Sequence, residues 1–412
     1  MLERIEIENL GSIRKTALSL GPLTVLLGAN ASGKTTVMRG IELFAALRSK
    51  PLRDVTFAGH AFTYAEWPLL IHGGDQTRRL SIRSWVDADS TEPDYEMQIG
   101  PNWARWTATI TEHAVEPAVE LEFLFERMLD PSGSWIEARA SAHDATDVGE
   151  YLIRTLPVKY RGPRSESIAN RIAHFKEFPP HQDQMADLIH FAELFGTAQY
   201  FRPNGAAMLT AGSGGRVGLS GEGFIAALAV LQNRESERFE AIERQLSQLF
   251  PHIRRIRFDI GTKGTIQRLV FETHRSNQRI PAELEADGVL TTLFLLWAGA
   301  TTPHHGTLLI DEPEAALHPH LMGKRVEFLR SLAMGEFTGY PLRVVVATQS
   351  VDFVRWLDTS EIRVVEYSPE TGTRVHAIPE SETLRTLVDK FQANTGDLWY
   401  SGALGGVPGT GA

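Results

Sequence analysis

Two short segments of the chain carry the residue types of phosphate chemistry. Residues 28–35 read Gly-Ala-Asn-Ala-Ser-Gly-Lys-Thr, and residues 307–312 read Thr-Leu-Leu-Ile-Asp-Glu. The first matches the P-loop pattern G-x-x-x-x-G-K-[ST], in which glycines let backbone N–H groups turn toward phosphate oxygens. The second is an apolar run that ends in two carboxylates, as in a Walker B strand. Together they predict a site that binds and hydrolyses a nucleoside triphosphate.

The P-loop residues have separate expected tasks. Lys34 can reach the β- and γ-phosphates, and the Thr35 hydroxyl can ligate Mg²⁺. A helix that starts after the loop adds the positive end of its dipole. The expected nucleotide contacts of this segment are Gly28, Asn30, Ala31, Ser32, Gly33, Lys34, Thr35 and Thr36. The expected cofactors are ATP and Mg²⁺.

Three further side chains complete the predicted reaction site. We expect Asp311 to hold the Mg²⁺ and Glu312 to orient or deprotonate the attacking water. Gln349 follows an apolar strand and can donate a hydrogen bond to a phosphate oxygen or hold the water. Lys34, Glu312 and Gln349 are therefore the predicted catalytic residues, although Gln349 could also be an ordinary residue at the end of a strand.

Alternating elements should position these residues. An apolar run at 23–27 predicts a buried strand before the P-loop, and helical spacing over 35–47 predicts a helix after it. From residue 284 onward the pattern predicts a helix, the strand 307–311, a helix over 320–333 and the strand 343–348. This alternation is typical of an α/β fold.

The rest of the chain gives a coarser pattern. Residues 1–27 predict two strands with a turn at 9–11, and residues 203–223 predict a loop. Strands are predicted at 79–85, 95–99, 103–110, 119–125, 135–140, 253–260 and 267–273, and helices over 148–195 and 224–250. The predicted division is an ATPase core (1–48 and 280–370), a β-rich lobe (49–145), a helical insert lobe (146–279) and a loose tail segment (371–412).

Composition narrows the class of protein. The chain has 412 residues, a formal charge of −10 and no cysteine, so disulfides and thiolate metal sites are excluded. The N-terminus carries no visible secretory signal, and no apolar stretch approaches the length of a membrane helix, so we expect a cytoplasmic protein. The acidic balance disfavours non-specific coating of nucleic acid, although the basic segment 252–257 could contact phosphates.

A further motif lies 23 residues before Asp311, where Asp287-Gly288 opens an apolar helix. With this motif and the two Walker segments, residues 1–45 and about 280–365 resemble the ABC-type ATPase heads of the SMC, RecF and OLD group. The resemblance implies an ABC-type P-loop ATPase head with an antiparallel β-subdomain and an inserted helical subdomain. It also implies that Asp287 and Gly288 cap the ATP of a second copy, in a sandwich dimer or higher homo-oligomer. Ala286 replaces a serine that this group often has there.

Two other segments extend the resemblance. Residues 313–319 are similar to the D-loop of these families, which lies along the dimer interface. The compact head, without a coiled coil, together with residues 396–406 resembles stand-alone AAA-family ATPases of bacterial anti-phage defence, including the PARIS type. That resemblance implies a separate effector protein, such as a TOPRIM-type nuclease supplied in trans, because the segment after residue 348 is too short to hold one.

Several alternatives remain open on sequence grounds. Leu219-Ser220-Gly221-Glu222-Gly223 resembles an ABC signature but lies 91 residues before Asp311, so we interpret it as a loop before a helix. Gln199 is a weak candidate for the Q-loop. The histidines at 304, 305, 318 and 320 fit surface positions better than zinc. Alternative functions are a RecF-like DNA-binding clamp, the motor of a membrane transporter, and a scaffold that binds nucleotide but hardly hydrolyses it.

Overall fold

The computed structural model divides into two compact units. Unit 1 comprises Met1–Gly21, Gly28–Ala198 and Arg363–Ala377, and unit 2 comprises Pro22–Leu27, Gln199–Ile362 and Ile378–Ala412. The predicted four-part division is finer than this and stays a prediction. The structure describes residues 1–50, 54–57, 60–61, 66–75, 78–86, 89–101, 107–111, 114–118, 121–129, 135–139, 148–153, 159–163, 197–210, 217–260, 266–274, 278–378, 394–401 and 403–404.

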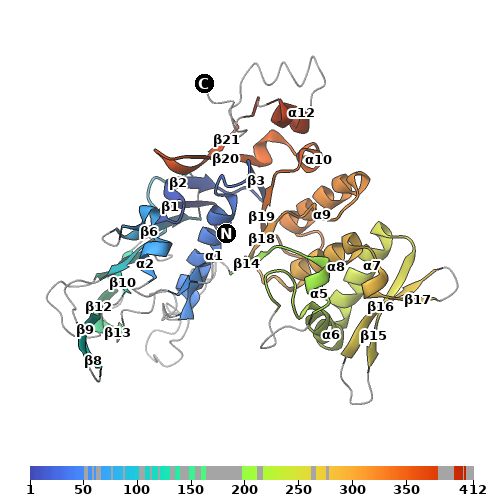
Figure 1. Cartoon of the computed structure of the whole chain (residues 1–412), viewed down its shortest axis with the longest axis horizontal. Coiled ribbons are helices and arrows are strands. Elements are labelled where there is room, and N and C mark those ends of the chain that lie inside the picture. Colours follow the sequence, from blue (N-terminus) through green and yellow to red (C-terminus); the bar gives the residue numbers. More distant parts are fainter. Residues whose placement is uncertain are drawn as a thin grey trace. The chain divides into compact units, whose positions relative to one another are not determined.

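Unit 1 is built on an eight-stranded antiparallel sheet (Figure 1). In spatial order its strands are β13 (Lys159–Pro163), β12 (Val148–Ile153), β11 (Trp135–Arg139), β10 (Leu121–Leu129), β7 (Tyr95–Pro101), β6 (Leu80–Trp85), β1 (Arg4–Leu10) and β2 (Ile13–Ser19). The alternation of Ile5 and Ile7 buries both side chains on one face of β1. Helix α1 (Lys34–Ser49) packs closely on that face, because a Cβ on Gly40 would lie 2.5 Å from Ile7 Cδ1.

Smaller elements complete unit 1. They are β4 (Thr56–Phe57), β5 (His60–Ala61), α2 (Trp67–Leu70), η2 (His72–Gly74), the hairpin β8–β9 (Thr107–Thr111 and Ala114–Ala118) and the hairpin β20–β21 (Ile362–Ser368 and Gly372–Ala377). Residue Ile362, at the start of β20, belongs to unit 2. The β20–β21 hairpin matters for function because its second strand supports the P-loop.

The structure corrects the secondary-structure prediction in unit 1. The expected helix over 148–195 is wrong at its start, where β12 and β13 pair as antiparallel strands, and residues 164–196 lie outside the described ranges. Tyr151, Ile153 and Tyr160 are strand-forming residue types, so sheet pairing outweighs the helical spacing. Residues 1–27 hold three strands rather than two, because β2 ends at Ser19, before the buried strand of unit 2.

Unit 2 contains the parallel strands expected of an α/β fold, and the predicted class is confirmed. Strands β14 (Ala198–Phe201), β18 (Thr307–Asp311), β19 (Arg343–Thr348) and β3 (Leu23–Leu27) follow one another across a sheet. The pairs β18–β19 and β19–β3 are parallel, and all residues of these three strands are buried. Continuous apolar runs are typical of parallel strands that are covered on both faces.

Helices cover the sheet of unit 2. They are α5 (Gly205–Met208), α6 (Phe224–Arg234), α7 (Ser236–Leu249), α8 (Asp287–Thr301), α9 (Met322–Met334), α10 (Val351–Val354) and α12 (Thr395–Tyr400). The 3-10 turns η3 (Ala282–Leu284), η4 (Pro319–Leu321) and η5 (Thr359–Glu361) and a sheet of β15 (Ile253–Ile260), β16 (Ile266–Thr273) and β17 (Arg279–Pro281) complete the unit. Helix α8 is buried along nearly its whole length, which explains why it is apolar on every side.

Two segments of unit 2 are more ordered than their sequences predict. The expected loop 203–223 contains helix α5, which Asn204 caps by accepting a hydrogen bond from the Ala207 N–H. The tail expected to be loose from residue 398 begins inside α12, where Leu398 and Trp399 are buried. Residues 405–412 lie outside the described ranges.

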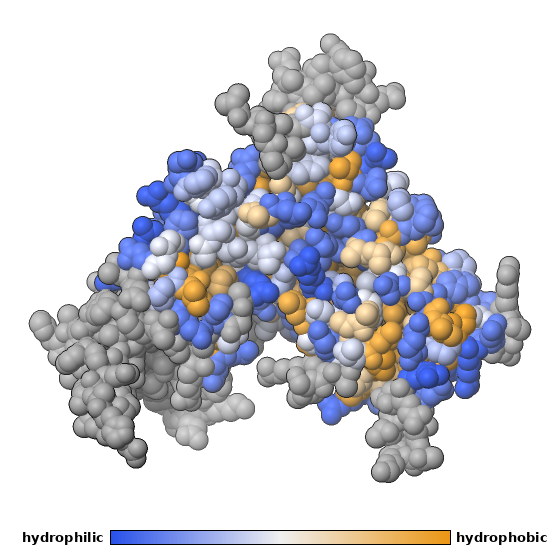
Figure 2. Space-filling model, viewed as in Figure 1, coloured by the Kyte–Doolittle hydropathy of each residue, from blue (hydrophilic) through white to orange (hydrophobic). Residues whose placement is uncertain are grey.

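The surface of unit 2 carries some apolar side chains. Orange surface residues gather in the region of α6, α7 and the β15–β17 sheet (Figure 2). Val230 on α6 and Leu284 on η3 are exposed there. No helix within the described ranges is long and apolar enough to cross a membrane.

Candidate nucleotide-binding site

The P-loop of unit 1 has the backbone shape that its sequence predicts. Gly33 caps α1 with a left-handed φ of 99°, and its carbonyl accepts the Val37 N–H at 3.0 Å, which starts the helix. Ala31 also has a positive φ, 63°, which is uncommon for a residue with a side chain. The loop therefore curls tightly over residues 28–33, as a phosphate cradle requires.

Lys34 is folded back on the loop. Its Nζ donates to the carbonyl oxygens of Gly28 at 2.7 Å and Ala29 at 2.8 Å. Asn30, Ala31 and Thr35 are exposed, and Thr36 is half-buried. A nucleotide phosphate could therefore reach the exposed residues, and Lys34 would exchange carbonyl oxygens for phosphate oxygens.

Ser32 and the hairpin β20–β21 form the floor of the loop. Ser32 is buried, and its Oγ has no hydrogen-bond partner among the described residues. The Thr373 hydroxyl donates to the Ser32 carbonyl at 3.1 Å. A Cβ on Gly33 would lie 2.1 Å from Thr373 Oγ1, and one on Gly28 would lie 2.4 Å from the Val365 carbonyl oxygen. Both glycines are thus required by close approach of β20 and β21.

Asp311, in unit 2, is the last residue of β18. It is 4% exposed, and its Oδ2 accepts the Tyr200 hydroxyl at 2.9 Å. Tyr200 comes from the neighbouring strand β14. The hydrogen bond fixes the orientation of the carboxylate that we expect to hold the metal.

Glu312 is held differently. Its φ of 52° is left-handed, and its N–H donates to the Ala347 carbonyl at 2.8 Å, so the chain turns sharply after β18. Arg202 Nη2 donates to Oε2 at 3.2 Å, and Gln349 Nε2 donates to Oε1 at 3.4 Å. The bond to Glu312 raises the pKa of Arg202. The predicted catalytic residues Glu312 and Gln349 therefore lie together.

The strand register aligns these groups along one edge of the unit 2 sheet. Asp311 pairs with Ala347, and Thr348 pairs with Leu27, the last residue of β3. Gly28, the first residue of the P-loop, follows Leu27 in the chain. Parallel sheets commonly carry ligand-binding residues at the carboxyl ends of their strands, where Asp311 and Thr348 lie here.

The D-loop-like segment, residues 313–319, contains a second buried carboxyl group. Glu314 Oε1 accepts the Thr348 hydroxyl at 2.6 Å. Burial, with a smaller contribution from the nearby Glu312 and Asp311 carboxylates, raises the pKa of Glu314 to about 7. Arg325 on α9 donates to the Pro313 carbonyl at 2.6 Å. The segment is thus bonded to both β19 and α9.

The predicted signature residues begin α8. Asp287 is exposed, whereas Gly288 is buried. A Cβ on Gly288 would lie 2.7 Å from the Ala316 carbonyl oxygen, and one on Gly205 would lie 2.4 Å from Asp287 Oδ1. Gly288 therefore packs directly on the D-loop-like segment. The rival segment 219–223 is, as predicted, a loop that leads into α6.

The oxygen donors fit the expected metal. A buried carboxylate at Asp311 and an exposed hydroxyl at Thr35 are hard ligands of the kind that Mg²⁺ takes, with phosphate and water oxygens completing its shell. Among the described residues, no three His, Cys, Asp or Glu side chains gather into a closed metal cage. Each of the two oxygen donors is by itself of a type that suits Mg²⁺.

Sequence reasoning missed Tyr200, Arg202, Thr373 and Arg325. The first two were detectable in principle, because they stand two apart at the end of a strand and so lie on the same side. The sequence singled out Gln199, the residue before Tyr200. Its Oε1 accepts the Thr302 hydroxyl at 3.4 Å, away from the carboxylates. Thr373 and Arg325 carry no local signal, because their partners are distant in sequence.

Two family models match separate parts of the chain. A model described as "AAA ATPase domain" matches residues 1–101, which include the P-loop. A model described as "AAA domain, putative AbiEii toxin, Type IV TA system" matches residues 223–355, which include Asp287, Asp311, Glu312 and Gln349. Both halves of the candidate site therefore lie in stretches that match ATPase domains.

One curated protein and several solved structures are also similar. An OLD nuclease from Thermus scotoductus is 44% identical over 43 residues, which are 10% of this chain and only 8% of that protein. An Smc head bound to the C-winged helix domain of ScpA shares 15% identity with a TM-score of 0.45, covering 93% of this chain and 99% of that chain. An Smc head with an extended coiled coil, bound to the C-terminal domain of ScpA derived from Pyrococcus furiosus, shares 12% identity with a TM-score of 0.45, covering 95% of this chain and 99% of that chain.

Proposed function

We propose that this chain is a Mg²⁺-dependent ATPase of the ABC type, in which two copies enclose ATP. The observation that carries the proposal is the unequal treatment of two adjacent carboxylates at the end of β18. Asp311 is buried and oriented by a hydroxyl, whereas both oxygens of Glu312 accept hydrogen bonds from long, polar side chains. The first environment suits a metal ligand and the second a group that must hold and activate water.

The residues divide the work of phosphoryl transfer. The N–H groups of the P-loop and Lys34 would bind the phosphates, and the Thr35 hydroxyl and Asp311 would hold the metal. Bound Mg²⁺ would neutralise charge on the phosphate oxygens. Glu312 takes the proton of the attacking water, and Gln349 holds either that carboxylate or the water through its amide. Arg202 holds the Glu312 side chain through its hydrogen bond to Oε2 until the site is loaded.

In the proposed dimer, Asp287 and Gly288 of one copy contact the nucleotide bound to the other copy. The N-terminal end of α8 carries a partial positive charge, and the side chain of Asp287 is exposed beside it. We expect this end to cap the γ-phosphate held by the P-loop of the other copy, so that ATP drives association and hydrolysis reverses it.

The test is the mass of the protein by light scattering, with and without ATP and Mg²⁺, together with phosphate release. We expect Glu312→Gln to bind ATP, to lower turnover about a hundredfold or more, and to trap the larger species. Glu336→Gln, an exposed change beyond α9, is the matched control and should behave as wild type. A fixed mass with turnover independent of Glu312 would favour a nucleotide-binding scaffold instead.

We extend the proposal to a biological role in anti-phage defence, where the nucleotide state controls an effector such as a TOPRIM-type nuclease in trans. Its support is the model whose description names a toxin, and the short match to an OLD nuclease. The test is co-purification with a nuclease from a neighbouring gene, with ATP and without it. Failure to co-purify in every nucleotide state would count against the effector.

A RecF-like DNA-binding ATPase is the alternative, and one observation favours it. Three guanidinium groups surround the Glu272 carboxylate, from Arg254 at 3.3 Å, Arg257 at 3.5 Å and Arg279 at 3.5 Å. The pairing of β15 with β16 is irregular between Ile253 and Arg255, and the side chain of the intervening Arg254 reaches Glu272. This surplus of positive charge could meet phosphates, so DNA stimulation of turnover at low salt separates the two functions.

A further inference from the structure

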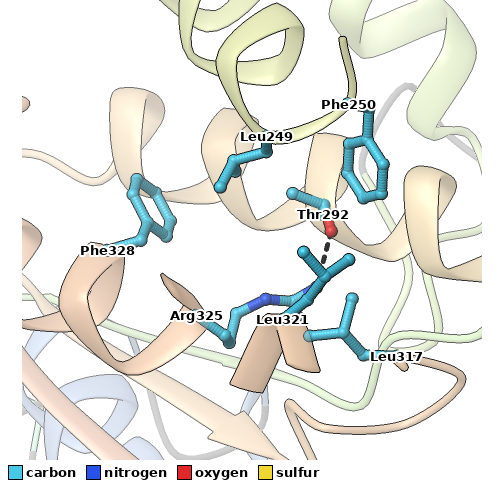
Figure 3. A pocket seen from close by; sticks show the side chains of 7 residues that line it. All are labelled: Leu249, Phe250, Thr292, Leu317, Leu321, Arg325 and Phe328. Carbon is cyan, nitrogen blue, oxygen red and sulfur yellow. Dashed lines mark hydrogen bonds between the residues drawn. The ribbon is translucent and has the colours of Figure 1, made fainter. Parts of the chain in front are cut away.

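A continuous chain of hydrogen bonds links the signature helix α8 to the D-loop-like segment. The Thr292 hydroxyl donates to the Gly288 carbonyl at 2.6 Å, and Arg325 Nη2 donates to Thr292 Oγ1 at 2.6 Å (Figure 3). The other terminal nitrogen of Arg325 donates to the Pro313 carbonyl at 2.6 Å. Arg325 thus bonds simultaneously to the helix that carries Gly288 and to the residue that follows Glu312.

Burial of an arginine at position 325 costs free energy, because the charge loses its hydration. Arg325 is 3% exposed, and burial lowers its pKa to about 10, so it is still protonated at neutral pH. Apolar side chains surround it in the pocket of Figure 3: Leu249, Phe250, Leu317, Leu321 and Phe328. Packing alone would be served by an apolar residue, whereas a buried charge needs hydrogen-bond partners to offset its loss of hydration. The guanidinium therefore serves something other than packing.

The same two segments touch at a second point. A Cβ on Gly288 would lie 2.7 Å from the Ala316 carbonyl oxygen, so the helix and the loop are in backbone contact there. Glu314, which follows Pro313, accepts a hydrogen bond from the Thr348 hydroxyl. Gln349, which follows Thr348, donates a hydrogen bond to Glu312. These contacts connect α8 to the residues around the carboxylate end of β18.

We propose that Arg325 is a positioning residue that makes α8 and the D-loop-like segment move together, so that engagement of Gly288 by a second copy changes the setting of Glu312. This inference rests on the proposed ATPase function. It makes the buried guanidinium of Arg325 the link between the signature and the Walker B carboxylates, which are the two predicted nucleotide contacts of one chain.

The surroundings of Arg325 allow a variant that folds. The walls of the pocket beside Arg325 are mostly apolar. Arg325→Met keeps an unbranched, flexible apolar stem and removes both hydrogen bonds. Arg325→Lys keeps the charge and is the rescue variant. Arg330→Met is the matched control, because Arg330 lies on the same helix and bonds Glu361 at 2.7 and 2.8 Å without touching α8 or the loop.

The kinetic test measures turnover, ATP affinity and ATP-dependent mass in all three variants. We expect Arg325→Met to lower kcat and the ATP-dependent association about tenfold while the affinity for ATP changes less than about threefold. Arg325→Lys should recover part of the loss, and Arg330→Met should match wild type. Wild-type kcat in Arg325→Met, or equal losses in Arg325→Met and Arg330→Met, would overturn the proposal.

Hydrogen exchange of the nucleotide-free protein separates this proposal from the ATPase itself. Arg325→Met should speed exchange at the amides of 288–292 and of 314–317 together, and Arg330→Met should leave both unchanged. A wild-type protein without turnover would contradict the proposed function, whereas joint acceleration would still support the tie. Acceleration in only one segment, or in neither, would contradict the tie whatever the turnover.

Discussion

The P-loop of unit 1 and the carboxylate edge of unit 2 are held in opposite ways. In the P-loop the contacts are mainly local: Lys34 bonds to carbonyl oxygens only five and six residues away, and Gly33 starts the helix with its own backbone, while the distant Thr373 adds a hydroxyl bond to the Ser32 carbonyl. At the carboxylate edge, Asp311 and Glu312 are held by Tyr200 and Arg202, which lie more than a hundred residues earlier in the chain.

The difference indicates which part of the candidate site should tolerate a single substitution and which part should not. A loop held by local bonds keeps its shape when one side chain changes, because the backbone supplies most of the structure. A buried polar network depends on every member, since a lost partner leaves another group unsatisfied in a medium of low dielectric. Changes at the P-loop should therefore affect binding more than stability, and changes at the carboxylate edge should affect both.

The largest expected effect is that of Lys34→Ala. Removing the ammonium should weaken ATP binding about a hundredfold to a thousandfold, by analogy with other preorganised charge stabilisers, while the unfolding temperature changes little. Titration with a fluorescent ATP analogue and thermal unfolding measure the two quantities. Lys324→Ala, an exposed change on α9, is the control. A large loss of stability in Lys34→Ala would break the comparison.

The next effect concerns pH and Glu314, whose pKa burial raises from 4.5 to about 7. Below pH 4.5 both the folded and the unfolded chain hold this proton. Between these two values the unfolded carboxyl loses it first, so the free energy of unfolding should fall as pH rises, by up to about 3 kcal/mol. Above pH 7 this contribution should be constant.

Glu314→Gln cannot ionise, so its stability should lack this fall. Chemical unfolding at several pH values without nucleotide or Mg²⁺ measures the difference from wild type. Glu327→Gln, at an exposed position on α9, is the control and should keep the wild-type dependence of stability on pH. Parallel pH profiles of Glu314→Gln and wild type would contradict the raised pKa.

Tyr200→Phe should have a smaller effect, both on stability and on the Mg²⁺ dependence of turnover. It removes the hydrogen bond to the buried Asp311 carboxylate, which is worth about 2 kcal/mol for a charged acceptor. We also expect the Mg²⁺ concentration for half-maximal turnover to rise, because the carboxylate loses its fixed orientation. Tyr367→Phe, at a half-exposed hydroxyl on β20, is the control. Unchanged stability would show that local packing alone positions Asp311.

Arg202→Gln should have the smallest effect on stability. The Arg202 side chain is 57% exposed, so its ion pair with Glu312 is screened and should contribute less than about 1 kcal/mol. Denaturant unfolding at low and high salt should show a wild-type advantage that salt removes. A difference that persists in high salt would mean that Arg202 belongs to the buried network.

Much of the site could be predicted because its signals are local. The P-loop spacing, the apolar run before Asp311 and the Gly288 that opens α8 all lie within short windows, and the helices and strands around them are confirmed. The errors fall elsewhere. Residues 148–153 have helical spacing yet pair with β11 and β13, and Leu398 belongs to a packed helix in a segment rich in glycine. In both places contacts with distant residues outweigh the local pattern.

The sequence by itself determined which segments carry the residue types of phosphate chemistry. Eight residues with two obligatory glycines specify the shape of a phosphate loop, and a buried apolar strand that ends in Asp311, followed by Glu312, specifies a pair of carboxylates at a strand end. Only the tertiary structure decided which side chains hold those carboxylates, namely Tyr200, Arg202 and Gln349, and that Arg325 ties α8 to the loop after Glu312. The physical reason is range: backbone geometry is encoded by neighbours in sequence, whereas a buried polar group is satisfied by whichever distant residue the fold brings within a hydrogen bond.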